Sequence, residues 1–185
     1  NIFFQKTKFY NFMLKLILNF NNINNIIFQN LINNNKYKDR YNNNNDIFIH
    51  IRAGDIFSNS NLLPTYDYYD KILSDYANDY QNIYLCSDNH KNYIFRNLKK
   101  KYKINLIEYG ISDNILFGST CKYIILSGGS YSFMFGLFGF YSKKIFFNKN
   151  HNKIFSNNEK TRWYPDYYSE FLNIGKRKYT KDFTN

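Results

Sequence analysis

Short apolar runs alternate with longer amphipathic stretches between residues 46 and 147 of the 185-residue chain. The apolar runs have the length of buried strands, and the longer stretches repeat their apolar residues at helical spacing. Expected strands cover 47–51, 82–86, 104–107, 123–126 and 144–147, and expected helices cover 66–80, 90–102, 113–119 and 130–141. This alternation predicts βαβ units and a parallel sheet covered on both faces. The predicted fold class is α/β, with a Rossmann-like domain.

The chain ahead of this pattern divides into a helical segment and a polar run. Helical spacing of apolar residues predicts one or two helices over 9–33, whereas the Asn-rich run 33–45 lacks periodicity and predicts a linker or exposed loop. Lys15 and several asparagines interrupt the apolar character of the first segment, which argues against a membrane span. We therefore expect an N-terminal segment 1–45 and a domain 46–185 that ends in a helical tail.

Charge adds an expectation about ligands. The chain carries 25 basic and 14 acidic residues, a net charge of +11, which favours an anionic ligand such as a nucleotide diphosphate, a nucleic acid or a membrane surface. The alternative is codon bias in an AT-rich genome, since Lys, Asn, Ile, Tyr and Phe are enriched together. The arginines are only five, at positions 40, 52, 96, 162 and 177, so an arginine inside a motif is more informative than a lysine.

Cysteine and histidine give no sign of a metal site. Cys86 and Cys121 fall in or beside expected strands and outside any C-x-x-C pattern, so both are expected to be free core thiols. The three histidines, His50, His90 and His151, lack metal-ligand spacing. No metal is expected.

The first candidate site is the segment His50-Ile-Arg-Ala-Gly-Asp55, at the end of the first expected strand. His50 and Arg52 are two residues apart, on one face of the strand end, directly before a glycine turn at Gly54. The Arg52 guanidinium can bind a pair of phosphate oxygens and neutralise a diphosphate leaving group. Asp55 can hold the turn through loop amides and is the nearby candidate for a general base. A strand end with a surface arginine and an Asp-capped turn is the alternative.

Two further strand ends carry candidate binding residues. Ser127-Gly-Gly-Ser-Tyr-Ser-Phe133 lies between an expected strand and an expected helix, where backbone amides and hydroxyls favour an anion; ordinary helix capping is the alternative. No Gly-Lys-Ser/Thr follows, so the segment is not a P-loop. Asp88 ends the second strand and is a candidate contact to a base or ribose, or a turn former. Glu108 also ends a strand and receives no role.

Together these segments resemble the fucosyltransferase superfamily, with the α1,2-fucosyltransferases as the most similar branch. The segment from His50 to Asp55 is similar to the H-x-R-x-G-D signature of that branch, and Pro64 with Tyr68-Tyr69 resembles the residues that follow it. Ile83-Tyr-Leu-Cys-Ser-Asp88 resembles the family strand that ends in Ser-Asp. The stretch 119–133 resembles its strand followed by a small-residue turn and an aromatic. Order and spacing agree over about residues 46 to 147.

The resemblance implies the donor-binding half of an inverting GT-B glycosyltransferase that transfers fucose from GDP-fucose to a glycan hydroxyl without a required metal. Arg52 would hold the β-phosphate and, with Asp55, form the catalytic pair. The implied donor-binding residues are His50, Arg52, Gly54, Asp88, Ser127, Gly129, Ser130, Ser132 and Phe133. Two departures are present: Ala53 stands where many relatives have a second arginine, and the chain is short for two Rossmann-like domains.

Two other function classes stay open. Ala53 and the short chain favour a catalytically reduced nucleotide-binding or glycan-binding module. A nucleic-acid binder ranks last, because the aromatic residues fall on expected core faces and no RNP or zinc-finger pattern is present. Acceptor, linkage and oligomeric state are not indicated. The compartment is also open: the cytoplasm is favoured, and a chain that starts at Asn1 rather than Met is compatible with an upstream targeting segment.

Overall fold

The computed structural model describes residues 26–54, 64–139 and 141–146 of the chain. Within them lies one five-stranded sheet in the order β3-β2-β1-β4-β5, and every neighbouring pair of strands is parallel. The strands are β1 (Ile47–Ile51), β2 (Ile83–Ser87), β3 (Ile104–Leu106), β4 (Tyr123–Ile125) and β5 (Lys144–Phe146). The chain thus builds the sheet outward from β1 to β3, then returns to the other side of β1 for β4 and β5.

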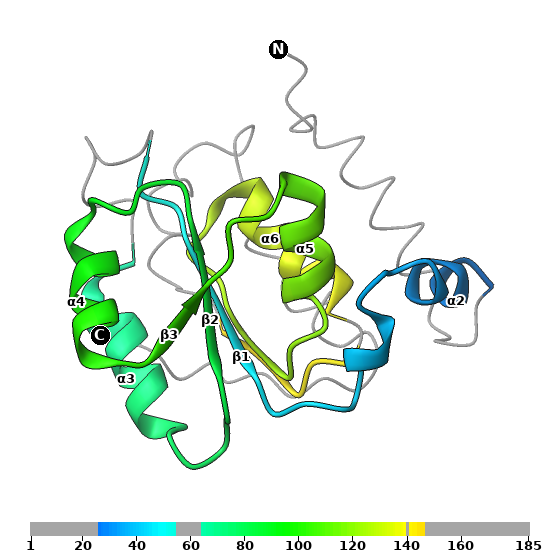
Figure 1. Cartoon of the computed structure of the whole chain (residues 1–185), viewed down its shortest axis with the longest axis horizontal. Helices are drawn as coiled ribbons and strands as arrows, with labels where there is room; N and C mark the ends of the chain where they lie inside the picture. The colour runs from blue at the N-terminus through cyan, green and yellow to red at the C-terminus, as the bar shows by residue number, and fades with distance from the viewer. Residues whose placement is uncertain (1–25, 55–63, 140, 147–185) are drawn as a thin grey trace, which may run out of the picture.

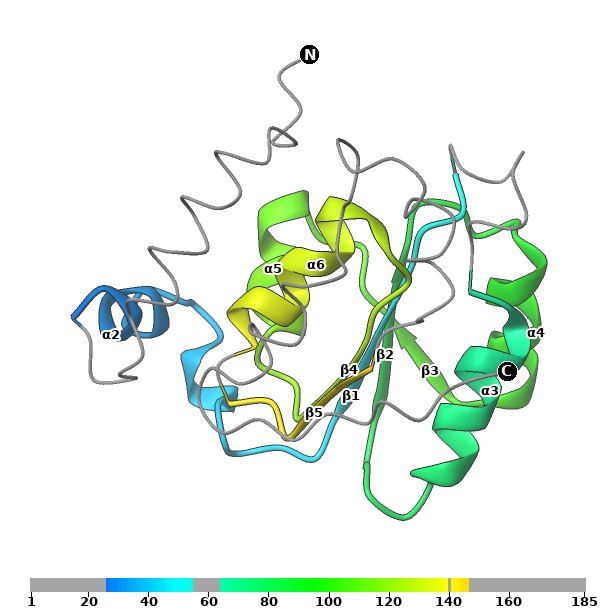
Figure 2. The ribbon, with the colours of Figure 1, turned by 180° about the vertical axis from the view of Figure 1, so that it is seen from behind.

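Helices cover both faces of this sheet. The described helices are α2 (Ile26–Asn33), α3 (Tyr66–Asp75), α4 (Tyr93–Lys101), α5 (Ile111–Gly118) and α6 (Gly129–Phe138), with a 3-10 helix η1 (Lys38–Arg40). Figures 1 and 2 show α3 and α4 against one face and α5 and α6 against the other. None of the described helices has the length and apolar character needed to cross a membrane. The α/β class and the parallel sheet are therefore confirmed.

Two apolar cores follow from the alternation of side chains along β1. Ile47, Ile49 and Ile51 pack in the core shared with α3 and α4, whereas Phe48 packs in the core shared with α5 and α6. All five residues of β1 are buried because both faces of a parallel sheet are covered. This explains why the strand is a continuous apolar run in the sequence, broken only by His50.

The boundaries of all four helices expected after residue 46 differ from expectation; α5 begins at Ile111 rather than 113, and α6 ends at Phe138 rather than 141. The helix expected to reach residue 80 ends at Asp75, where a turn follows and the Tyr80 hydroxyl donates to the Leu73 carbonyl at 3.1 Å. The helix expected from residue 90 begins at Tyr93, because Asn92 is its N-cap and accepts from the Ile94 amide at 2.8 Å. The expected strands are confirmed to within a residue at each end. The expected helix before residue 26 and the C-terminal tail lie outside the described residues.

The Asn-rich run 33–45 is exposed over much of its length, as its composition predicted, but two of its side chains point inward. Asn35 and Tyr41 are buried, and Asn35 donates to the Tyr41 hydroxyl at 3.0 Å and to the Leu116 carbonyl at 2.9 Å. The run therefore packs against α5 and the amino ends of the strands. Apolar periodicity could not show this, because the contacts are made by polar side chains. The division of the chain at residue 45 stays a prediction.

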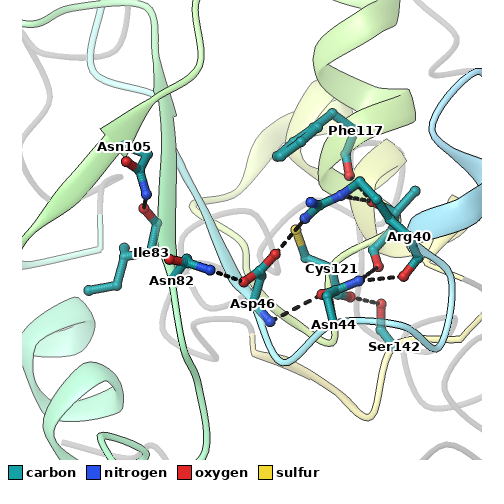
Figure 3. A network of polar contacts seen from close by, with 10 residues as sticks. Arg40, Asn44, Asp46, Asn82, Ile83, Asn105, Phe117, Cys121 and Ser142 are labelled. Carbon is teal, nitrogen blue, oxygen red and sulfur yellow. Dashed lines mark hydrogen bonds and ion pairs between the residues drawn. The ribbon is translucent and has the colours of Figure 1, made fainter.

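A polar network joins this run to the sheet, as Figure 3 shows. The Arg40 guanidinium donates to Asp46 Oδ2 at 2.7 Å and to Thr120 Oγ1 at 3.0 Å, and its charge lies 4.3 Å from the Phe117 ring centroid. Asp46 is buried and also accepts from Asn82 Nδ2 at 2.8 Å. Because Asp46 directly precedes β1, the network fixes the amino end of the central strand, opposite the edge where β1 ends.

Candidate functional site

The candidate site lies at the carboxyl edge of the sheet, where β1 is flanked by β2 and β4. The parallel register pairs Ile51 of β1 with Ser87 of β2, so the loops that follow these strands leave the sheet side by side. The β4 loop, from Leu126, leaves on the other side of β1. The strand order reverses at β1, and in open parallel sheets such a reversal is where ligands bind. The three sequence-predicted segments therefore meet at one edge.

Asp88 holds the loop after β1. Its Oδ1 accepts from the Ala53 amide at 2.6 Å and from the Gly54 amide at 2.9 Å. A Cβ atom on Gly54 would lie 2.9 Å from Asp88 Oδ2, so any larger residue would force this carboxylate to shift. The sequence had suggested a turn-holding carboxylate at Asp55, and the structure shows one at Asp88. Asp55 lies outside the described residues, and its catalytic role stays a prediction.

Ser127 connects the loop after β4 to the end of β1. Its hydroxyl oxygen accepts from the Arg52 amide at 3.1 Å and lies 3.2 Å from His50 Nδ1. The Ser127 amide in turn donates to Ser132 Oγ at 2.9 Å. Ser127 and Ser132 are both buried, so they shape the turn from within rather than presenting hydroxyls to solvent. The Arg52 side chain is partly exposed at this edge.

His50 is a buried neutral imidazole. It is 2% exposed, and its ring contacts Tyr131 and Phe135 of α6 at centroid distances of 5.1 and 5.2 Å. Burial, with a smaller effect from the Arg52 charge, lowers the pKa of His50 from 6.5 to about 3. Such a weak base cannot activate an acceptor hydroxyl or Ser127 at neutral pH. His50 therefore acts on this edge by positioning Ser127.

The pKa of His50 predicts a specific loss of stability in acid. The unfolded chain binds a proton at this histidine below pH 6.5, and the folded chain does so only near pH 3, so stability falls as pH drops through this interval. At pH 5.5 the free energy of unfolding should have fallen by about 1 kcal/mol because of His50. We expect His50→Asn, whose amide can replace Nδ1 beside Ser127, to avoid this part of the fall. Urea unfolding of both proteins between pH 7.5 and pH 4.5 measures it. If the stability of both proteins changed with pH in the same way, the result would contradict a neutral, buried His50.

The turn before α6 has a backbone suited to an anion. Gly128 adopts φ 119°, a left-handed region that favours glycine, and α6 begins at Gly129 without a side-chain cap hydrogen bond. Helix N-terminal amides that lack such a cap attract negative charge. The capping role that the sequence allowed for Ser132 is not observed, since its oxygen accepts from Ser127. The side chains of Ser130 and Phe133 lie outside the described residues.

Two adjacent tyrosines of α3 support the same edge. The Tyr68 hydroxyl donates to the Leu126 carbonyl at 3.1 Å, and the Tyr69 hydroxyl reaches the His50 carbonyl at 3.5 Å. Both side chains are buried, and burial raises the pKa of each phenol above its usual value. Neither is therefore an acid or base for chemistry at neutral pH. Residue pattern alone did not assign these contacts, because adjacent aromatic residues at a helix start are usually core.

Metal and thiol chemistry receive no support from the described residues. They contain no group of three His, Cys, Asp or Glu side chains that could hold a metal ion. Cys86 and Cys121 are free and buried, as expected, and burial raises the pKa of their thiols to about 11 and about 12. What the edge offers is the Arg52 cation, the glycine turn with its α6 amides, and a rigid hydrogen-bonded frame beneath them.

Comparison of the chain with protein-family models, with curated proteins and with solved structures finds no match.

Proposed function

We propose that the chain is a fucosyltransferase-like glycosyltransferase that binds the diphosphate of a nucleotide sugar at the carboxyl edge of β1 and β4. One observation carries the proposal: three segments that resemble family motifs, far apart in sequence, are hydrogen-bonded to one another. Asp88 bonds to Ala53 and Gly54, and Ser127 bonds to Arg52 and lies beside His50. The parallel sheet, whose strand order reverses at β1, is compatible with the Rossmann-like, donor-binding half of the GT-B type that we propose.

In this proposal Arg52 and the α6 N-terminus share one task. An acceptor hydroxyl attacks the anomeric carbon of fucose, the bond to the β-phosphate oxygen breaks, and GDP leaves with the negative charge. Arg52 neutralises that charge through its guanidinium, and the backbone amides at the Gly128 turn add a fixed dipole. Asp88 and Ser127 keep the two loops in place while the charge develops. The acceptor proton goes to a base, for which Asp55 is the candidate from sequence.

A non-catalytic nucleotide-binding module is the second candidate, and Ala53 favours it. The position is fully buried in the core beneath α3 and α4, while its amide is held by Asp88. An arginine there would not fit without displacing the core, so the chain supplies a single motif cation where many family members have two. A single cation is better suited to binding a diphosphate than to stabilising the negative charge that develops when the diphosphate leaves.

Titration with GDP tests the proposal. We expect GDP and GDP-fucose to bind the full chain more tightly than UDP, and Arg52→Ala to weaken GDP binding about 10- to 100-fold, as loss of a charge-assisted hydrogen bond does. Lys103→Ala is the matched control, since it removes the same charge from an exposed position directly before β3. Calorimetry on the three proteins gives the affinities. Equal weakening by both substitutions, or no GDP binding by folded protein, would rule out the edge site.

Turnover separates the two candidate functions. Release of fucose from GDP-fucose, or its transfer to any glycan of an acceptor panel, identifies an enzyme. Tight GDP binding that depends on Arg52, without release or transfer over the panel, identifies the binding module.

A further inference from the structure

A basic groove lies on another flank of the sheet, between α4 and the edge strand β3. Its lining residues are His90, Phe95, Arg96, Lys99, Lys100 and Leu106, and its volume is about 490 Å³. Phe95 is buried, and the exposed His90 ring stacks on it at a centroid distance of 4.6 Å and an interplanar angle of 12°. Groove and candidate site share no lining residue, so the groove is a separate feature.

Three cations of the groove come from one face of α4. Arg96, Lys99 and Lys100 have the i, i+3, i+4 spacing that places side chains together on a helix. All three are exposed, and none forms an ion pair with another of the described residues. By contrast, the neighbouring Lys101 pairs with Asp70 at 2.7 Å. The groove therefore concentrates positive charge that the described protein does not neutralise.

Stabilisation of the α4 carboxyl terminus explains only part of this charge. Lysines in the last turn of a helix interact favourably with its dipole, and Lys99, Lys100 and Lys101 are all placed there. Arg96 lies one turn earlier, where that effect has decayed. The acidic group near the groove is Glu108, and its carboxylate contacts His90 at 3.5 Å rather than the three cations. A ligand anion accounts for the whole arrangement.

We propose that this groove binds a sugar-sized organic anion through a phosphate or carboxylate group. Arg96, Lys99 and Lys100 hold the anionic group, and the body of the ligand lies against Leu106 and the exposed His90 ring. The volume is within the range of small-molecule sites. The Leu106 side chain and the His90 ring beside the cations favour such a ligand over a free inorganic ion, which has no apolar surface to place against them. The inference does not rest on the proposed nucleotide-sugar site.

Amide NMR of the full chain, titrated separately with glucose 6-phosphate, glucuronate, glucose and inorganic phosphate, tests the groove. We expect at least one of the two sugar anions to shift groove amides and to bind tighter than both glucose and inorganic phosphate. The triple variant Arg96→Gln, Lys99→Gln, Lys100→Gln should weaken that binding roughly tenfold or more. The charge-matched control is Lys38→Gln, Lys71→Gln, Lys103→Gln, which removes three exposed lysines outside the groove and should retain the affinity.

Three outcomes would overturn the proposal. They are absence of binding by both sugar anions, equal weakening in the two triple variants, and binding no tighter than that of inorganic phosphate. The same triple variant also keeps the two sites apart. Its GDP affinity should be unchanged if GDP binds at Arg52, and a loss of GDP affinity there would show that the groove, and not the β1 edge, is the nucleotide site.

Discussion

Asp46→Ala is expected to lower the free energy of unfolding by about 2 kcal/mol, because it leaves the half-buried Arg40 guanidinium without its buried anion. Asp46 Oδ2 accepts from Arg40 at 2.7 Å and its Oδ1 from Asn82 at 2.8 Å, so the substitution also leaves an amide without its acceptor. Chemical denaturation at neutral pH measures the loss. Asp39→Ala removes the same charge from an exposed position and should change stability by less than about 0.5 kcal/mol.

A double variant isolates the pair itself. Arg40→Met combined with Asp46→Ala removes both charges, so it should be less destabilised than the sum of the two single substitutions. The expected coupling is about 1 to 3 kcal/mol, as for residues in direct contact. Additive losses would mean that the network of Figure 3 contributes through packing alone.

Gly118→Val should cost about 3 kcal/mol for a steric reason. A Cβ atom on Gly118 would lie 2.8 Å from ring atoms of both Phe48 and Phe135, which are fully buried between β1 and α6. Neither ring has an empty space to move into, so the added methyl groups overpack the core. Thermal and denaturant unfolding give the value.

Gly110 provides the control for this substitution. It precedes α5 as Gly118 ends it, and a Cβ atom there would meet nothing within 4 Å. We expect Gly110→Val to cost no more than about 1 kcal/mol, mainly through the weaker N-cap. If Gly118→Val and Gly110→Val lower the free energy of unfolding equally, the cost comes from the loss of glycine flexibility. It would then not come from the close approach of α5 to the Phe48 and Phe135 rings.

Sequence predicted the sheet well because the central strands β1 and β4 are buried on both faces. In an α/β fold an apolar run such as Ile47–Ile51 is typical of a buried strand, and the helices between such runs repeat their apolar residues at helical spacing. Helix ends were less predictable, since Asn92 caps α4 through a side-chain bond that apolar periodicity does not reveal. The inward contacts of the polar run before β1 were not predicted for the same reason, because they are made by the polar side chains of Asn35 and Arg40.

For the candidate site, the sequence identified the segments but not which of their residues are hydrogen-bonded to one another. Strand ends, glycines and an arginine pointed to residues 52–54, 88 and 127, and the parallel sheet places their loops at one edge. The sequence could not show that Asp88 holds the turn. Asp55 is next to the turn in sequence, whereas Asp88 is next to it only across the sheet. The burial of His50 was equally hidden, as an imidazole in a strand suits both a core and a ligand-binding position.

The hydrogen bonds at the carboxyl edge of the sheet also determine the stage of folding at which this edge can form. Those that join residues 52–54 to Asp88 and Ser127 span 34 to 75 positions of the chain. Closing such long loops is slow, and it requires β1, β2 and β4 to be already in place. A chain still emerging from the ribosome can form α3, α4 and their core against β1 and β2 before residue 127 is available. The hydrogen-bonded frame of this edge is therefore completed late in synthesis, after β1, β2 and β3 have been made.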